Sequence, residues 1–130
     1  MTVQTIQVGQ TLPPLVIDAS PTFVVASAIA TRDYQDVHHD RDLAQQKGSK
    51  DIFVNILTSQ GLVQRYVTDS LGHDIEIRSI DIRLGAPAYP GDTLVFSGSV
   101  ESETDGLTTL KVRGDVSLGA HINGTVVVKK

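Results

Sequence analysis

Residues 53–69, with the sequence FVNILTSQGLVQRYVTD, decide the fold of this chain. They contain no proline and are long enough for about five turns of α-helix. At 100° per residue, the apolar side chains on one expected face are Phe53, Ile56, Leu57, Val63 and Val67. The polar side chains on the opposite face are Asn55, Thr58, Ser59, Arg65 and Asp69. This stretch therefore predicts the main buried helix, with Asp51 as its expected N-cap.

The pattern changes to a period of two after this helix. Isoleucines and a leucine between residues 75 and 84 alternate with charged side chains, which is typical of a strand with one solvent-facing side. Further strands are expected over Thr93–Glu103, Leu107–Leu118 and His121–Val128, and Asp105-Gly106 is a strong hairpin signal. The C-terminal half is therefore predicted to be an antiparallel meander, and the fold an α+β arrangement in which the sheet wraps the helix.

The residues before the long helix are divided by prolines and polar side chains. Pro13-Pro14 and Pro21 isolate a short N-terminal segment, after which an apolar run leads into the polar stretch Asp33–Asp42. Asp40–Lys47 is expected to form a short helix that ends at Gly48. About five strands in a chain of this size leave a sheet edge uncovered, so an oligomer is expected.

Composition limits the possible classes of function. The 130 residues suffice for one domain over residues 1–130, and 40% of them are hydrophobic. A net charge of −4, without a basic stripe, argues against binding to nucleic acid or to an anionic membrane. The absence of cysteine excludes disulfides and thiolate chemistry. MTVQTIQVGQTLPP does not resemble a secretory signal, and there is no apolar run of about 18 residues, so we expect a soluble, cytoplasmic protein.

One carboxylate and one imidazole in the polar stretch suggest acid–base chemistry. Adding water to a double bond conjugated to a thioester needs one group that takes a proton from water, another that gives a proton to the α-carbon, and donors to the enolate oxygen. Asp33 and His38 would lie about 140° apart on an ideal helix, so they converge only if residues 34–37 form a turn. From spacing alone, solvated loop residues are the more common outcome.

A metal site is the alternative for the same stretch. The possible ligands are His38, His39, Asp33, Asp36, Asp40 and Asp42. Adjacent histidines rarely converge on one ion, so no metal is expected. His39 and Asp40 are expected to orient the loop or bind solvent, and His73 and His121, at element ends, are expected on the surface.

The order of these motifs resembles a known family. Asp33 and His38 are followed by the long helix, then by IRLGAP at residues 82–87 and by PGDTL at residues 90–94. This order resembles the MaoC-like branch of the hotdog-fold proteins, the (R)-specific enoyl-CoA hydratases. More narrowly, ATRDYQDVHHDRD at residues 30–42 and GSKDIFVNILTSQGLVQRYVTD at residues 48–69 resemble the small MaoC-like subunits of actinobacterial steroid side-chain hydratases.

The resemblance implies specific roles for several residues. Asp33 and His38 match the paired catalytic residues, with Asp33 favoured as the base and His38 as the proton donor, although the sequence leaves this assignment open. The backbone amide near Asn55 matches the position that binds the enolate oxygen. The family commonly has glycine at Asn55 and at Arg32, and Asn-Pro at residues 35–36 where this chain has Gln-Asp. These departures imply an altered pocket for an acyl group larger than a straight chain, and no cofactor is needed.

The same resemblance implies a substrate and a partner. The expected reaction is hydration of a steroid side-chain enoyl-CoA, and the expected assembly is a heterotetramer with a second MaoC-like chain. Lys47 and Lys50 are weak candidates for contacts with coenzyme A phosphates, and Gln60 and Gln64 are expected at a subunit edge. Alternatives are a hydratase of straight-chain enoyl-CoA, a purely structural subunit, and a hotdog thioesterase, which usually carries an acid on its long helix. Residues 53–68 contain no carboxylate, which argues against the thioesterase.

Overall fold

The computed structural model describes residues 6–130, so the first five residues of the N-terminal stretch lie outside the described part. The elements along the chain are β1 (Thr11–Ala19), α1 (Pro21–Ala30), a 3₁₀ turn η1 (Asp36–His38), α2 (Arg41–Gln46), α3 (Ile56–Leu71), β2 (Glu76–Leu84), β3 (Asp92–Thr104), β4 (Leu107–Val116) and β5 (Gly119–Lys129). Among these residues no helix is long and apolar enough to cross a membrane.

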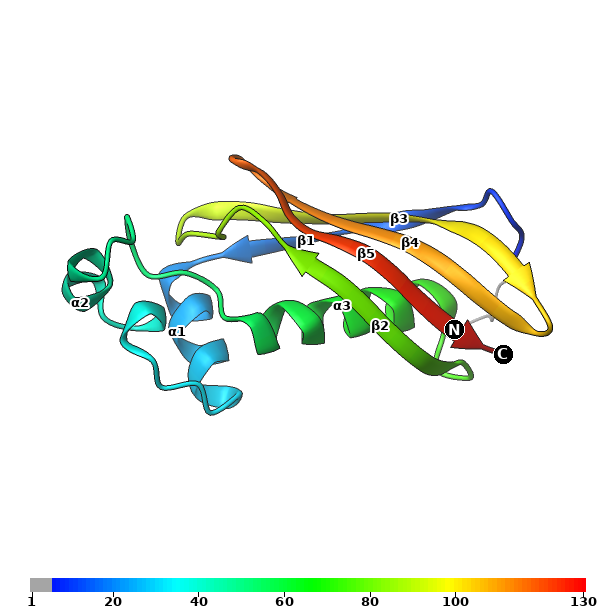
Figure 1. Cartoon of the computed structure of the whole chain (residues 1–130), viewed down its shortest axis with the longest axis horizontal. Helices are drawn as coiled ribbons and strands as arrows, with labels where there is room; N and C mark the ends of the chain where they lie inside the picture. Colours follow the sequence, from blue (N-terminus) through cyan, green and yellow to red (C-terminus); the bar gives the residue numbers. More distant parts are fainter. Residues whose placement is uncertain (1–5) are drawn as a thin grey trace.

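The strands form one antiparallel sheet in the order β1-β3-β4-β5-β2. α3 runs along one side of this sheet, while α1, η1 and α2 gather beyond the N-terminal end of α3 (Figure 1). This is the predicted hotdog arrangement of a sheet around one long helix, and that prediction is confirmed. The meander holds only for β3, β4 and β5, because β2 pairs with β5 at the far edge rather than with β3.

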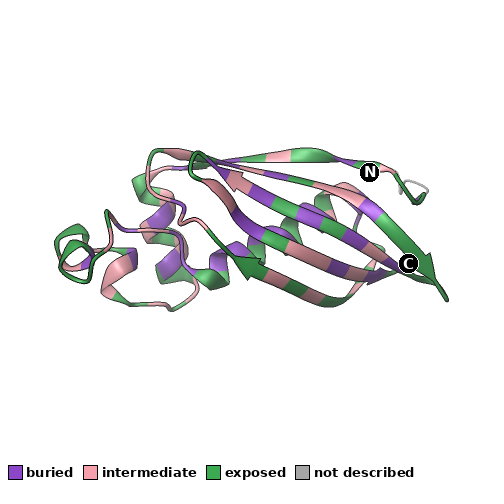
Figure 2. Ribbon diagram, turned by 45° about the horizontal axis from the view of Figure 1, so that its top comes forward, coloured by how far each residue is buried: buried purple, intermediate pink, exposed green. Residues whose placement is uncertain are grey.

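The hydrophobic core lies between α3 and the sheet. Buried side chains alternate with exposed ones along the inner strands (Figure 2). Tyr66 of α3 stacks on Phe96 of β3 with 5.8 Å between ring centroids, and both side chains are buried. Burial of each large apolar side chain contributes about 1.5–3 kcal/mol, so this layer provides most of the stabilisation of the fold.

The long helix differs from its prediction at its N-terminal end. It begins at Ile56 after an Asn55 N-cap, rather than near Phe53 after an Asp51 cap. Ile56 and Leu57 are 50% and 47% exposed, whereas Thr58 and Ser59 are buried. The predicted faces were therefore wrong in this turn.

The hydroxyl groups explain this burial. Thr58 donates a hydrogen bond to the side chain of Asn55, and Ser59 bonds to the ring of His121. A buried hydroxyl that has a partner avoids most of the desolvation cost, so polar residues can replace apolar ones at the core-facing positions of this turn. Gln60 and Gln64 of the same helix are exposed.

The sequence did not reveal the first strand or the first helix. β1 pairs with β3, and its register shifts between Leu12 and Leu15, where the two adjacent prolines lie. Proline is tolerated there because β1 is an edge strand. α1 begins with Pro21, and the Ser20 side chain accepts a hydrogen bond from the N–H of Phe23.

The remaining element predictions are confirmed within a few residues. Asp40 caps α2 by accepting a hydrogen bond from the N–H of Leu43, and Gly48 follows the helix with φ of 93°. Asp105 and Gly106 connect β3 to β4 as predicted, both with positive φ.

Candidate active site

The structure brings Asp33 and His38 together at the N-terminal end of α3. Asp33 lies in the loop after α1, and η1 turns the chain so that His38 points back toward it. The distance from Asp33 Oδ2 to His38 Nε2 is 3.4 Å. A departure from α-helical geometry between the two residues, which includes the 3₁₀ turn η1, therefore brings their side chains together.

Backbone contacts fix the imidazole of His38. Its Nδ1 lies 2.8 Å from the carbonyl oxygen of Phe53. A carbonyl oxygen only accepts, so Nδ1 carries a hydrogen and donates it, which leaves Nε2 facing Asp33. The ring packs edge-on against the Phe53 side chain, and the Phe53 N–H donates to the Val37 carbonyl at 3.1 Å. His38 is buried and has one defined ring orientation.

The carboxylate of Asp33 lies at the rim of the site. Its side chain is 15% exposed, compared with 6% for His38. Oδ1 accepts a hydrogen bond from the N–H of Gln35 at 3.3 Å, and Oδ2 accepts one from Asn55 Nδ2 at 3.2 Å. The carboxylate is therefore held from two sides while part of it faces outward.

The turn before Asp33 has unusual backbone geometry. Arg32 has φ of 58°, in the left-handed region that costs a non-glycine residue about 1–2 kcal/mol. The N–H of Asp33 donates to the carbonyl of Ala28 at 2.9 Å, which closes the end of α1. Arg32 stands where the resemblance has glycine, and the positive φ gives the physical reason for that preference.

Asn55, predicted near the enolate-binding position, occupies the N-cap position of α3 without a capping hydrogen bond from its side chain, and it is completely buried. Its side-chain amide bonds to other residues of the chain and does not face outward. The first N–H groups of an α-helix have no acceptor within the helix, and Ile56 at this position is half exposed. Enolate binding by a backbone amide at this helix start stays a prediction.

His121, predicted on the surface, is buried, so that prediction was wrong. Its Nδ1 lies 2.8 Å from the carbonyl oxygen of Ala86, and its Nε2 lies 2.7 Å from Ser59 Oγ. Burial lowers the pKa of His121 and outweighs the opposing effect of the Ala86 carbonyl. The neutral ring therefore donates through Nδ1 and accepts the Ser59 hydroxyl proton at Nε2. His73, also predicted on the surface, is exposed.

The two candidate lysines have different partners. Lys47 Nζ forms an ion pair with Asp36 Oδ2 at 3.2 Å, whereas Lys50 Nζ lies 5.7 Å from the centroid of the Tyr89 ring. Their role toward coenzyme A stays a prediction. The described residues contain no group of three or more histidine or acidic side chains arranged to hold a metal ion.

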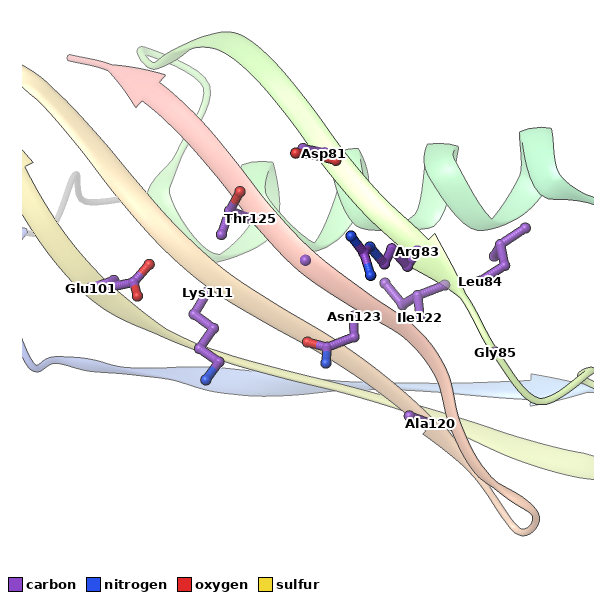
Figure 3. A pocket seen from close by; sticks show the side chains of 11 residues that line it. Asp81, Arg83, Leu84, Gly85, Glu101, Lys111, Ala120, Ile122, Asn123 and Thr125 are labelled. Carbon is purple, nitrogen blue, oxygen red and sulfur yellow. The ribbon is translucent and has the colours of Figure 1, made fainter.

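Surface hollows also occur away from the acid–histidine pair. One of about 450 Å³ lies over β4, β5 and the end of β2, and in Figure 3 the ribbon of α3 runs behind these strands. Its lining includes Arg83, Lys111 and Glu101, but neither Asp33 nor His38. Another hollow lies along the outer flank of α1 and is lined by apolar side chains such as Val25 and Ile29.

The geometry of the acid–histidine pair suits proton transfer to and from one small molecule. A carboxylate and an imidazole nitrogen at the rim of a hydrophobic core can both reach a water that lies between them and a substrate. This pair was predicted from the sequence, whereas Thr31 and Thr58, whose hydroxyls bond to the Asn55 side chain, were not. Thr58 is three residues after Asn55, a spacing at which side chains at a helix start can meet, but Thr31 is 24 residues away and no local pattern indicated its contact.

Comparison with known proteins identifies the class. The MaoC-like domain family matches residues 5–120, and the chain belongs to this family. The beta subunit of 3-oxo-4,17-pregnadiene-20-carboxyl-CoA hydratase from Mycobacterium tuberculosis is 59% identical to it over 119 residues, which cover 92% of each chain.

Solved structures agree with this assignment. A chain of the ChsH1-ChsH2 complex from M. tuberculosis superposes with a TM-score of 0.93 at 56% identity, covering 96% of this chain and 98% of that one. The (R)-hydratase from A. caviae that is involved in PHA biosynthesis gives a TM-score of 0.87 at 21% identity, with 98% of each chain covered. At that identity the second match supports only the shared fold.

Proposed function

We propose that this chain is the catalytic subunit of a hydratase that adds water across the α,β double bond of a steroid side-chain enoyl-CoA. The observation that carries the proposal is the approach of His38 Nε2 to Asp33 Oδ2, within a chain 59% identical to a steroid-carboxyl-CoA hydratase subunit. An acid and a base side by side are what hydration requires.

The proposed reaction uses both groups on one water molecule. The Asp33 carboxylate takes a proton from water while the water oxygen bonds to the β-carbon, and the electrons of the double bond move toward the thioester oxygen. Backbone N–H groups at the start of α3 donate to the resulting enolate oxygen. His38, protonated at Nε2, then gives a proton to the α-carbon.

The pair is restored by an internal transfer. The proton on Asp33 passes to His38 Nε2 across the 3.4 Å that separates them. Because Nδ1 is held by the Phe53 carbonyl, Nε2 is the nitrogen that gains and loses the proton. The product contains the atoms of substrate and water without a change of overall oxidation state, so the reaction needs no cofactor.

The proposed assembly is a heterotetramer in which this chain, a single MaoC-like domain over residues 1–130, pairs with a second MaoC-like chain. It is supported by the similarity to a relative named as a beta subunit and to a chain of a solved two-protein complex. Among residues 6–130 the sheet also ends in two edge strands, β1 and β2, each of which pairs with one strand only, and such edges favour pairing with another chain. A cytoplasmic location is part of the same proposal.

The test is an assay of the complex purified from its native host with a steroid enoyl-CoA. Loss of the enoyl chromophore without release of free thiol is the expected result, and free thiol would indicate a thioesterase instead. Native mass determination should give two different chains. A homodimer that hydrates the steroid substrate alone would contradict the assembly, and a preference for short straight-chain enoyl-CoA would contradict the steroid assignment.

A further inference from the structure

The buried side chain of Asn55 is fully occupied by hydrogen bonds. Its Nδ2 donates to Thr31 Oγ1 at 2.8 Å and to Asp33 Oδ2 at 3.2 Å, and its Oδ1 accepts the hydroxyl of Thr58. With no exposed surface, this amide cannot reach a substrate. It therefore acts on other residues of the chain, and one of these is the proposed base.

The orientation of this amide is determined by its partners. Thr31 Oγ1 donates its own hydrogen to the end of α1, where the carbonyls of Ser27 and Ala28 lie at 2.8 and 3.1 Å. Thr31 therefore only accepts from Asn55. A flipped amide would turn its oxygen toward this acceptor and toward the Asp33 carboxylate, which is unfavourable.

Asp33 Oδ2 lies between two groups with different tasks. Asn55 Nδ2 approaches it at 3.2 Å and His38 Nε2 at 3.4 Å. The amide belongs to the N-cap of α3, so the same residue connects the carboxylate to the helix start whose N–H groups are proposed to bind the enolate oxygen. The distance between base and enolate donors thus depends on one short, buried side chain.

We infer that Asn55 is a positioning residue for hydration, which holds the Asp33 carboxylate in register with His38 and with the start of α3 through its side-chain amide. This inference rests on the proposed function. It assigns Asn55 a role different from the backbone contribution expected from the sequence, because the side chain acts on the base rather than on the substrate.

Two substitutions in the full chain, assembled with its second subunit, test this role. In Asn55→Ala the carboxylate loses its buried donor, and we expect kcat to fall about 10- to 100-fold with little change in KM, since a small misplacement of a reacting group costs this much. We also expect the pH–rate profile of this variant to differ from that of the wild type, because Asp33 Oδ2 loses its donor at 3.2 Å. Asn55→Asp has nearly the same shape but places two carboxylates together, so we expect a larger loss at neutral pH that is partly recovered at acidic pH.

Ser59→Ala is the matched control. Ser59 is also buried on α3, and its hydroxyl bonds to His121 and lies 3.4 Å from the backbone carbonyl of Asn55, but it contacts neither the Asn55 side chain nor Asp33. We expect this variant to lose stability while its pH–rate profile stays that of the wild type and its kcat stays within about threefold. Equal kcat losses and identical pH profiles in Asn55→Ala and Ser59→Ala would overturn the inference.

A readout that does not depend on the reaction separates this inference from the proposed function. The melting temperatures of Asn55→Ala, Asp33→Asn and the double variant should show losses that fall short of additivity, because the two residues share a contact. Additive losses would overturn the inference alone. A wild-type complex that does not hydrate the steroid enoyl-CoA would overturn the proposed function, and the role in hydration with it, even if the losses are coupled.

Discussion

Two histidines of this chain are held in nearly the same way but in different surroundings. His38 and His121 are both buried, and each donates its Nδ1 hydrogen to a backbone carbonyl at 2.8 Å, that of Phe53 or of Ala86. In each case Nε2 faces a polar side chain. The anchoring of the ring is therefore not what distinguishes a candidate catalytic histidine from a structural one.

The difference lies in the second nitrogen. His121 Nε2 completes a 2.7 Å hydrogen bond with the fully buried Ser59. His38 Nε2 lies 3.4 Å from a partly exposed carboxylate of Asp33, longer than a usual charge-assisted hydrogen bond. An imidazole whose two nitrogens both form short hydrogen bonds in the core, such as His121, stabilises the fold. An imidazole whose Nε2 has only a longer contact with a partly exposed carboxylate, such as His38, can exchange a proton.

The largest effect is expected when the His38 ring or its partner Asp33 is replaced. We expect His38→Ala and Asp33→Asn each to lower the rate of hydration by about 10²-fold or more, since general acid–base catalysis contributes at least this much. Both variants should still assemble. The measurement is steady-state kinetics of the purified complex with native mass analysis, and retention of more than a tenth of the wild-type rate would contradict the assignment.

Replacement of His121 should lower stability and leave the rate of hydration nearly unchanged. His121→Phe removes the donor to the Ala86 carbonyl and leaves the Ser59 hydroxyl only its 3.4 Å contact with the Asn55 carbonyl, and such a loss costs about 1–3 kcal/mol. We expect the urea midpoint of the complex to fall at fixed protein concentration, while the rate of hydration stays within about threefold. A large loss of rate with unchanged stability would reverse the comparison.

The pH dependence of stability should also distinguish the two regions. Burial lowers the pKa of His121 below its unfolded value of 6.5, so the unfolded chain binds the extra proton first. The contribution of the neutral His121 ring to the free energy of unfolding is complete above pH 6.5. It decreases as the pH falls toward the pKa of His121 in the folded protein, by at most about 1.4 kcal/mol per pH unit. In His121→Phe the free energy of unfolding should decrease less steeply between pH 6.5 and 5 than in the wild type, as measured by urea unfolding at each pH. An unchanged slope would show that another group is responsible.

The smallest expected effect concerns the backbone beside Asp33. Apart from glycines, only Arg32 and Asp105 have positive φ within residues 6–130, so no residue with a side chain has this strained backbone next to His121. Arg32→Gly should raise stability by about 0.5–1 kcal/mol, after subtraction of the entropy cost of glycine. Arg32→Ala, which keeps the Cβ atom, is the control and should bring no gain in thermal unfolding. Equal melting temperatures for both variants would contradict this account.

The approach of Asp33 to His38 was predictable because the two residues are close together in the sequence. Asp33 and His38 are five residues apart, and their order before the long helix matches a family pattern. The burial of His121 was not predictable in the same way, because Ser59, its partner, is 62 residues away in sequence. No local pattern at the start of β5 distinguishes a histidine that faces α3 from one that faces solvent.

The fold was predictable where a periodic pattern or a turn signal dominated. The period of two and the Asp105-Gly106 hairpin gave the C-terminal strands. β1 was missed because its adjacent prolines indicate a break, although an edge strand accommodates them at a register shift. The first turn of α3 was predicted with the wrong side facing the core because Thr58 and Ser59 are counted as polar. The partner of Ser59, His121, is 62 residues away, so the sequence pattern does not indicate it.

The Phe53 contacts have a consequence for how this protein could change in evolution. The N–H of Phe53 bonds to Val37, and its carbonyl bonds to the His38 ring. Residues 39–52, which include α2, therefore form a loop whose two ends are joined by these hydrogen bonds. The entropic cost of lengthening a loop whose ends are already joined is small. Insertions or substitutions in this loop, where Lys47 and Lys50 lie, would therefore change the surface that the loop presents and leave the ring of His38 in place.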